Sequence, residues 1–249
     1  MNSRRFFIKP EAIKDGIALL TGEEAHHLRS VLRLGVGETI TLFDGTGMRS
    51  LARLDSITKN QCTATVLEQS QDPQPKVRVE LCQALLKGQK MEFILQKATE
   101  LGIDAIHPFW SEHGATSKTR PEAREERWLR IALEACKQCN RALPPRIEPP
   151  RKLADLFQEL PDHDLKLLFW EQEQEQSLTE LLAPRLSGVR SLCFLVGPEG
   201  GFSKGEVEEA STKGFHPVSL GSRILRAETA TLAAAAILQH LLGNLSPSQ

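Results

Sequence analysis

The sequence has few cysteines and no long hydrophobic run. Its five cysteines are scattered along the chain, at Cys62, Cys82, Cys136, Cys139 and Cys193. An odd and irregularly spaced set does not form a disulfide framework, so we expect reduced thiols and a cytoplasmic protein. No apolar stretch approaches the length of a membrane-spanning helix, and none follows the charged Met1–Arg5 segment. We therefore expect no membrane anchor and no signal peptide.

Neither sign of charge is in excess. The 249 residues include 31 Lys and Arg and 32 Asp and Glu, for a formal net charge of −1. A strongly basic chain would by itself indicate nucleic-acid binding. This composition neither indicates nor excludes it, because a local basic face can bind RNA on a neutral protein. The length favours two domains.

The motifs of several common enzyme classes are missing. Gly197, Gly200 and Gly201 do not have the G-x-G-x-x-G spacing of dinucleotide-binding proteins, and there is no P-loop. The sequence also contains no H-E-x-x-H and no G-x-S-x-G. Cys136 and Cys139 form a C-x-x-C pair inside a predicted helix, but there is no second pair. We expect no metal site.

A polar segment with two prolines divides the chain. Gln69 to Lys76 has the composition of a linker. The expected division is a domain at 1–70, a linker at 71–76 and a domain at 77–249.

The first domain has the pattern of a small β-barrel with one helix. Thr21–Glu24 has a capping-box sequence, and apolar spacing predicts a helix that continues to about Leu34. Alternating residues then predict a meander of strands at 38–43, 48–57 and 62–67.

The second domain alternates between strand and helix patterns, which predicts a mostly parallel sheet with helices on both faces. The expected strands are 77–84, 103–110, 165–170, 191–196 and 216–220. The expected helices are 91–101, 121–141, 153–160, 178–186 and 228–242, with a polar loop at 111–120 that contains Lys118 and Arg120.

Two loops in this domain have the composition of ligand sites. The predicted strand 191–196 leads into Gly197–Phe202, and Ser203 with Glu206 then makes a capping box that starts a helix. This arrangement places the loop at the carboxyl end of the sheet, where α/β proteins bind ligands. Leu220–Ala230 makes a similar loop with two arginines, although its Glu228 is also explained by the helix dipole.

Two sets of polar residues share predicted helix faces. They are Glu134 with Gln138 and Arg141, and Arg29 with Arg33. On charge alone, a solvated helix surface explains both.

Together, Gly197–Ser203 and Leu220–Ala230 resemble motifs of the uridine N3-methyltransferases of small-subunit (16S) ribosomal RNA. These enzymes belong to the trefoil-knot (SPOUT) superfamily of S-adenosylmethionine-dependent RNA methyltransferases. The resemblance covers nearly the full length, with further matches at Arg4–Phe7, at His27–Arg33, at Lys97–Gly102, and at Glu134, Gln138 and Arg141. The loop from Trp170 to Glu173 is less similar to the family.

The resemblance implies a PUA-like RNA-binding barrel followed by a knotted sheet in a homodimer with the site at its interface. It implies small-subunit ribosomal RNA, within the assembled subunit, as the partner. The cofactor would be held by backbone groups of 168–171, 195–201 and 220–225. The implied cofactor-binding residues are Leu168, Trp170, Leu195, Gly197, Pro198, Glu199, Gly200, Gly201, Leu220, Gly221, Ile224 and Leu225.

The same resemblance suggests catalytic and RNA-binding roles. Arg226 and Arg141 would stabilise charge on the uracil oxygens. Glu228 or Glu199 would accept the N3 proton or orient an arginine. Residues expected to contact RNA are Arg4, Arg5, His27, Arg29 and Arg33. A nucleotide-dependent oxidoreductase and a non-catalytic ribosome-binding factor remain alternatives. The residues do not indicate which nucleotide is methylated.

Overall fold

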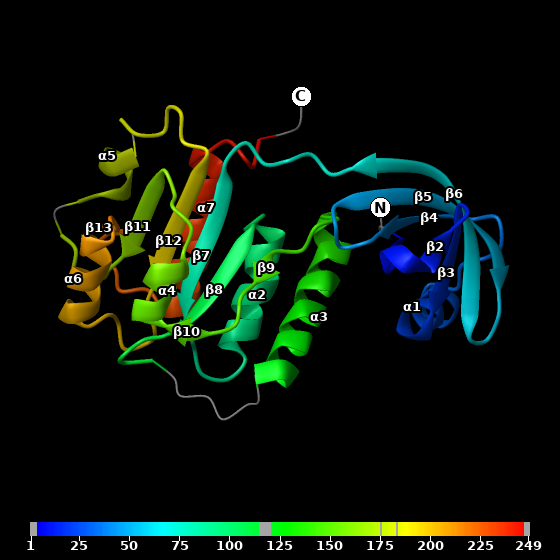
Figure 1. The fold of residues 1–249 in the computed structure, drawn as a ribbon, viewed down its shortest axis with the longest axis horizontal. Helices are drawn as coiled ribbons and strands as arrows, with labels where there is room; N and C mark the ends of the chain where they lie inside the picture. Colours follow the sequence, from blue (N-terminus) through cyan, green and yellow to red (C-terminus); the bar gives the residue numbers. More distant parts are fainter. Residues whose placement is uncertain (1–3, 115–120, 175, 183, 247–249) are drawn as a thin grey trace. The chain divides into compact units, whose positions relative to one another are not determined.

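The structure of the protein is a computed structural model that describes residues 4–114, 121–174, 176–182 and 184–246. The chain forms two compact units (Figure 1). The N-terminal unit combines Met1–Gln74 with Leu133–Pro144, and the C-terminal unit combines Pro75–Ala132 with Pro145–Gln249. Residues 115–120 of the predicted polar loop, with Lys118 and Arg120, lie outside the described residues.

The N-terminal unit contains a six-stranded sheet in the order β1-β4-β5-β6-β3-β2. Its strands are β1 (Arg5–Phe7), β2 (Ile13–Lys14), β3 (Ile17–Thr21), β4 (Thr39–Phe43), β5 (Met48–Ile57) and β6 (Gln61–Gln71). Side chains alternate along β5, where Ala52 and Leu54 are buried while Leu51 and Arg53 are exposed. This alternation places one face of the sheet on a core around Phe6. The predicted meander is present, because β4, β5 and β6 are neighbours in the sheet in that order.

Four local features of this unit differ from the sequence predictions. Strand β6 continues to Gln71 and pairs with β5, so Gln69–Gln71 are strand rather than linker. The helix at Thr21 is shorter than predicted, with α1 (Gly22–His26) followed by a single π-helical turn η2 (His27–Val31). Thr21 makes no side-chain capping bond, because Gly22 follows it with a φ of 60° instead of a helical value. Strands β1 to β3 and the short 3-10 turn η1 (Pro10–Ala12) had no clear sequence signal.

The C-terminal unit contains a parallel sheet in the order β10-β8-β7-β12-β11-β13, with β9 beside β8. Its strands are β7 (Arg78–Ala84), β8 (Ala105–Trp110), β9 (Arg146–Ile147), β10 (Arg151–Lys152), β11 (Leu165–Phe169), β12 (Ser191–Val196) and β13 (His216–Val218). Every residue of β12 is buried, as expected for a strand that is covered on both faces. The predicted mostly parallel sheet is confirmed.

Helices cover both faces of this sheet (Figure 1). They are α2 (Lys90–Glu100), α3 (Pro121–Cys139), α4 (Leu153–Glu159), α5 (Leu178–Leu182), α6 (Lys204–Thr212) and α7 (Ala227–Leu241). Phe194 and Val196 pack with α2 and α7 on one face, whereas Cys193 and Leu195 pack with α4 and α6 on the other. Successive side chains of β12 therefore belong to different cores.

Helix α3 ends before Arg141. Asn140 has a φ of 66°, a left-handed conformation that Asn adopts more readily than most residues and that stops the helix. The prediction that Glu134, Gln138 and Arg141 share a helix face is therefore wrong for Arg141. After the turn, the N–H of Ala142 donates to Oδ2 of Asp72 over 2.6 Å within the N-terminal unit.

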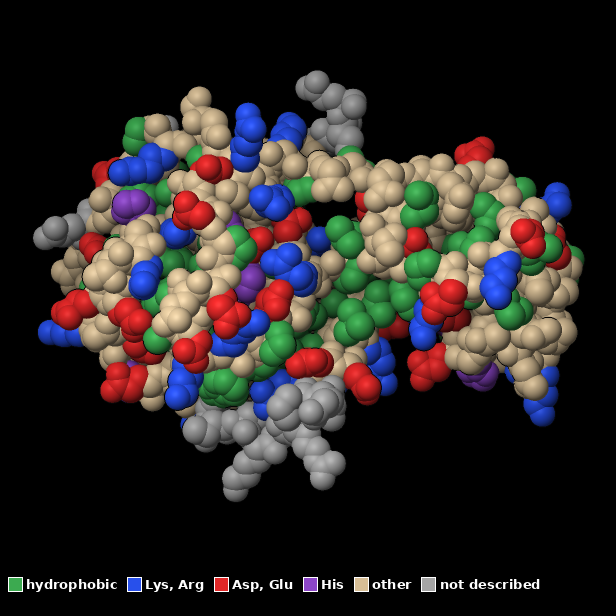
Figure 2. All heavy atoms as spheres, in the orientation of Figure 1, with side chains coloured by type: hydrophobic (Ala, Val, Ile, Leu, Met, Phe, Trp, Pro, Cys, Tyr) green, Lys and Arg blue, Asp and Glu red, His purple; other side chains and the backbone are tan. Residues whose placement is uncertain are grey.

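The cysteines and the surface charges follow the composition. All five cysteines are free thiols, with Cys136 buried and Cys139 half-buried on α3. On the face shown in Figure 2, Lys and Arg side chains lie among Asp and Glu side chains, and neither sign dominates.

Within the described ranges, no helix is long and apolar enough to cross a membrane. The same residues contain no group of three or more His, Cys, Asp or Glu placed to hold a metal ion.

Candidate active site

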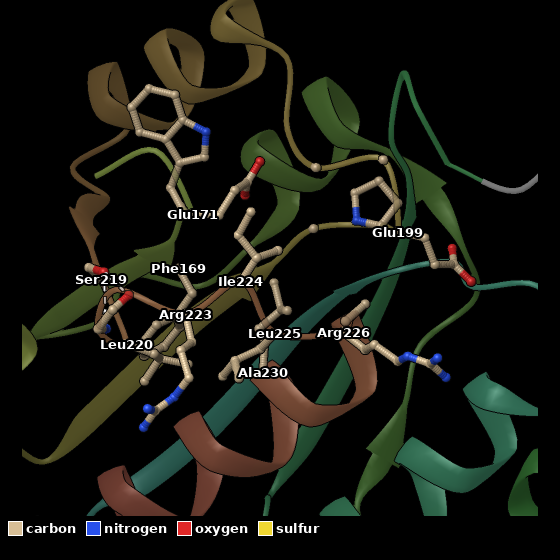
Figure 3. Close-up of a pocket in the computed structure, with 18 of the residues that line it drawn as sticks. Phe169, Glu171, Glu199, Ser219, Leu220, Arg223, Ile224, Leu225, Arg226 and Ala230 are labelled. Carbon is tan, nitrogen blue, oxygen red and sulfur yellow. Dashed lines mark hydrogen bonds between the residues drawn. The ribbon is translucent and has the colours of Figure 1, made fainter. Parts of the chain in front are cut away.

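Three strands end together at the carboxyl edge of the parallel sheet. Phe169, the last residue of β11, pairs with Val196 of β12 and with Val218 of β13. The segments that follow these strands therefore converge, and they line a cavity of about 540 Å³, called here the pocket (Figure 3). The lining residues are Lys90, Phe169–Glu171, Val196–Gly201, Ser219–Gly221, Arg223–Ala227 and Ala230.

The loop Gly197–Phe202 forms a tight turn at one side of the pocket. The N–H of Gly201 donates to the carbonyl of Pro198 over 3.0 Å, and Gly201 has a φ of 72°. A Cβ at Gly200 would lie 2.8 Å from Cβ of His113, so the loop has no room for a side chain there. These two glycines are required by backbone geometry and by close packing.

The predicted capping box after this loop is confirmed. Oγ of Ser203 accepts from the N–H of Glu206 over 3.3 Å, and the N–H of Ser203 donates to Oε2 of Glu206 over 2.9 Å. Oε1 of Glu206 also accepts from the N–H of Glu112 over 2.9 Å. The start of α6 is thereby fixed, and with it one end of the glycine loop.

Most of the predicted cofactor-binding residues line the pocket, but Leu168 and Leu195 do not. Both side chains are fully buried in the core on the opposite face of the sheet. Phe169 and Val196, one position later on each strand, face the pocket instead. Strand alternation determines this placement of the side chains, and contacts from the backbone of Leu168 and Leu195 stay a prediction.

The pocket fits the cofactor implied by the resemblance. Its volume is in the range of small-molecule sites. Apolar side chains of Phe169, Val196 and Leu225 line it together with the backbone of the glycine loop. The indole N–H of Trp170, another lining residue, is buried and has no hydrogen-bond partner among the described residues. A buried donor without an acceptor is costly, and a bound ligand would supply one.

Charged residues gather at one side of the pocket. Figure 3 shows Glu199 and Arg226 on the same side, with Arg223 on the other. Nζ of Lys90, at the start of α2, lies 3.0 Å from Oε1 of Glu199 and 3.7 Å from Oε2 of Glu228. Glu228 is itself mostly buried, and its Oε2 has no hydrogen-bond partner within the described part of the chain.

The pairing keeps Glu199 and Lys90 charged. Burial opposes ionisation of Glu199, but the ammonium of Lys90 and nearby backbone N–H groups outweigh it, so the pKa of Glu199 is lowered. The hydrogen bond to Glu199 raises the pKa of Lys90 in turn. Both groups are therefore ionised at neutral pH. Sequence reasoning missed Lys90, because it lies far from both glycine-containing loops in the chain.

A buried hydrogen bond connects β7 with α7. Oγ1 of Thr231 lies 2.6 Å from Oε1 of Gln83 and 2.9 Å from the carbonyl of Ala227. Nε2 of Gln83 donates to the carbonyl of Ala84 over 3.0 Å, and both side chains are fully buried. Since Ala227 lines the pocket, this contact fixes the turn of α7 that also contains Glu228.

The predicted RNA-binding residues have different environments. Arg5 is only 5% exposed, donates to the carbonyl of Arg141 over 2.8 Å, and lies over the ring of Phe43. Burial lowers its pKa, and these contacts within the N-terminal unit disfavour the predicted phosphate contact. Arg4 is exposed and pairs with Glu38.

The remaining predicted RNA contacts lie around the first helix. His27 is half-buried, with its ring 5.9 Å from that of Phe6. Arg29 lies in the π-helical turn, whereas Arg33 follows it with a φ of 52° and is exposed. The two arginines therefore do not share a regular helix face. Arg141, the second predicted catalytic arginine, belongs to the N-terminal unit and does not line the pocket.

Comparisons with known proteins match both units. A family model described as an RNA methyltransferase domain matches residues 72–239, and one described as an RNA methyltransferase PUA domain matches residues 20–67. Ribosomal RNA small subunit methyltransferase E of Bacillus subtilis is 32% identical over 89% of both chains. The protein of the same name from Rickettsia conorii is 33% identical over 98% of both.

Solved structures are similar over almost the whole chain. Ribosomal RNA small subunit methyltransferase E of Neisseria gonorrhoeae, bound to S-adenosylmethionine, has a TM-score of 0.85 and 35% identity, covering 96% of this chain and 98% of that one. A Legionella pneumophila methyltransferase, also in complex with S-adenosylmethionine, has a TM-score of 0.80 and 29% identity over the same shares.

Proposed function

We propose that this chain methylates N3 of a uridine in small-subunit ribosomal RNA. The chain belongs to the RNA methyltransferase family that includes ribosomal RNA small subunit methyltransferase E. Methylation of small-subunit ribosomal RNA with S-adenosylmethionine as cofactor is the activity of this family. The choice of uridine N3 is the finer part of the proposal, and the motifs at Gly197–Ser203 and Leu220–Ala230 support it.

The observation that carries the proposal is the pocket. Trp170, Gly197–Gly201 and Leu220–Leu225 line it and would hold the cofactor, which supplies an electrophilic methyl group when bound. The turn at Gly197–Gly201 is held tightly by the packing of His113 and Glu171 against its glycines, so its backbone groups are fixed in place. Acidic and basic side chains lie beside this cradle, where the reacting base would be positioned.

The two acids have different surroundings, which suggests different roles. Glu199 accepts from Nζ of Lys90 and from the N–H of Lys87, and its pKa is lowered, so it is a weak proton acceptor. Oε2 of Glu228 accepts no hydrogen bond from the described residues. We assign Glu228 as the group that accepts the N3 proton.

Arg226 is the candidate for stabilising the charge that develops on the uracil oxygens. It is the residue before α7, lines the pocket and is exposed, so its guanidinium can reach a bound base. The role of Arg141 in stabilising this charge stays a prediction, because Arg141 does not line the pocket.

The match to a PUA domain supports RNA binding by the N-terminal unit. Arg4, His27, Arg29 and Arg33 are the residues proposed to contact RNA there. The homodimer, the assembled small subunit as substrate and the threading of the sheet into a knot follow from the resemblance and stay predictions. The cytoplasmic location, inferred from the scattered cysteines, is a prediction too.

The two alternatives from other classes have less support. A nucleotide-dependent oxidoreductase lacks its glycine fingerprint and does not fit the methyltransferase family. A non-catalytic ribosome-binding factor would not need the charged cluster of Lys90, Glu199, Arg226 and Glu228 beside the pocket.

Radiolabelled methyl transfer tests the proposal. The protein and S-adenosylmethionine are incubated with small subunits that lack the modification, or with their deproteinised RNA. The modified nucleoside is then identified by digestion and mass spectrometry. N3-methyluridine is the expected product. Another methylated nucleoside would overturn the N3 assignment, and no incorporation with either substrate would overturn the activity.

A further inference from the structure

Lys90 stands at a position that local electrostatics disfavours. It is the first residue of α2, where the free N–H groups of a helix carry partial positive charge. Gln89 before it makes no side-chain capping bond that would offset this charge. A lysine that breaks a local preference beside a pocket is a candidate for a role in the site.

The ammonium of Lys90 connects three elements of the pocket. It lies 3.0 Å from Oε1 of Glu199 in the glycine loop and 3.7 Å from Oε2 of Glu228 on α7. The shorter contact is to Glu199, which also accepts from the N–H of Lys87 at 3.4 Å. Glu199 therefore holds the ammonium of Lys90 in place. From this position the ammonium also makes the longer contact with Glu228.

Charges around Lys90 come from each of these elements. Glu199 faces it from the glycine loop, and Glu228 and Arg226 face it from the start of α7. The cluster contains two cations and two carboxylates. Among the described residues, Glu228 has its ion pair with Lys90, so without Lys90 it would lose the charged contact that fixes its direction.

We propose that Lys90 is a positioning residue that acts on methyl transfer through Glu228, with Glu199 holding its ammonium in place. The proposal rests on the proposed function, because Glu228 is the assigned proton acceptor. Lys90 touches neither of the reacting atoms in this assignment, and its effect comes from orienting the carboxylate that does.

A kinetic comparison of variants tests this role. We expect Lys90→Met to lower kcat about tenfold, with KM for RNA changed by about twofold or less, because orientation in the transition state is lost rather than binding. Lys90→Arg should restore most of kcat, since a guanidinium can contact both acids. Lys166→Met is the matched control, because Lys166 pairs with Asp162 outside the pocket.

The second arm asks whether Lys90 acts through Glu228. In a Glu228→Asp background the carboxylate is one methylene shorter, and Lys90→Met should then lower kcat by about twofold or less. The same tenfold loss in both backgrounds would overturn the proposal, as would a failure of Lys90→Arg to restore turnover. Absence of methylation by the unchanged protein would instead overturn the proposed function.

A measurement without substrate tests the anchor. Titration of the Glu199 carboxyl carbon by NMR should show a higher pKa in Lys90→Gln than in the unchanged protein, because the ammonium that lowers it is gone. The same pKa in both would show that Glu199 does not hold Lys90, and would overturn the proposal independently of activity.

Discussion

Oγ1 of Thr231 lies 2.6 Å from Oε1 of Gln83 in an environment without solvent. An amide in such a place depends on its partner, since no water can replace a lost bond. The contact holds the first turns of α7 against β7, and that helix begins at the charged side of the pocket.

Replacing Thr231 by Val should destabilise the protein by about 1–3 kcal/mol, because the carbonyl oxygen of Gln83 would be buried without a donor. Urea denaturation at neutral pH measures the difference. Thr231→Ser keeps the hydroxyl and should lose much less. Equal stability of the Val variant and the unchanged protein would show that the bond contributes nothing.

Arg226→Ala should keep cofactor binding and lose most of the turnover. A group that stabilises charge only in the transition state contributes about 100-fold to 1,000-fold to kcat. Calorimetry with S-adenosylmethionine and methyl transfer to small subunits measure the two effects. Arg190→Ala, at an exposed loop position outside the pocket, is the control. Normal methylation by the Arg226 variant would contradict the assignment.

Gly201→Val should weaken cofactor binding by about tenfold or more. Gly201 has a φ of 72°, which strains any β-branched residue, and a Cβ there would collide with the carboxylate of Glu171. Calorimetry with S-adenosylmethionine measures the affinity. The matched control is Gly214→Val, because Gly214 has a φ of 84° but no atom within 4 Å of its Cβ position. Similar affinities in both variants would refute a role for the loop.

RNA binding should distinguish Arg33 from Arg5. Charge reversal in Arg33→Glu should weaken RNA binding and reduce the slope of log affinity against log salt by about one. Arg5→Met should leave that slope unchanged but destabilise the protein by about 1–3 kcal/mol, because Arg5 is buried and bonded to the carbonyl of Arg141. If Arg5→Met changed the salt slope and Arg33→Glu did not, Arg5 rather than Arg33 would be the residue that contacts RNA.

Stability should depend on pH through Glu80. Burial disfavours its charge, but hydrogen bonds from His107 at 2.7 Å and His163 at 3.3 Å outweigh this effect and hold the pKa of Glu80 below its usual range. A lowered pKa in the folded state contributes stability above the unfolded pKa, about 4.3, and this contribution is lost as pH falls through the folded value.

Glu80→Gln should therefore be less stable than the unchanged protein at pH 6, and the difference should shrink below about pH 4. Urea denaturation across this range gives the comparison. A difference that grows on acidification has the wrong sign for a carboxylate with a lowered pKa.

The sequence predicted the parts of the fold that depend on local pattern. Ser203 and Glu206 form the capping box because both partners stand at the required spacing before a helix. Thr21 and Glu24 have the same spacing, but Gly22 between them takes a left-handed conformation and the capping bond is not made. Whether a capping-box sequence makes its hydrogen bonds depends on the backbone conformation between its two residues, and the residue types alone do not determine that conformation.

The sequence predicted most of the residues that line the pocket, but it did not predict the charged contact between Lys90 and Glu199. The side chains of Leu168 and Leu195 lie on the other face of the sheet, as strand alternation requires, and Phe169 and Val196 line the pocket instead. Lys90 was not predicted, and Arg5 was predicted only as an RNA contact, for another reason. Their roles depend on partners more than a hundred residues away, Glu199 and Arg141, and no local pattern in one sequence shows such pairs.

The N-terminal unit is built from two separate parts of the chain, and this affects the order of folding. Its sheet lies within the first 74 residues, but Arg5 donates to Arg141, Asp72 accepts from Ala142, and Phe43 packs on Cys136. Closing so long a loop has an entropic cost, and contacts this distant in sequence form late. During synthesis, these contacts can therefore form only after the end of α3 has emerged, although the core around Phe6 lies within the first 74 residues.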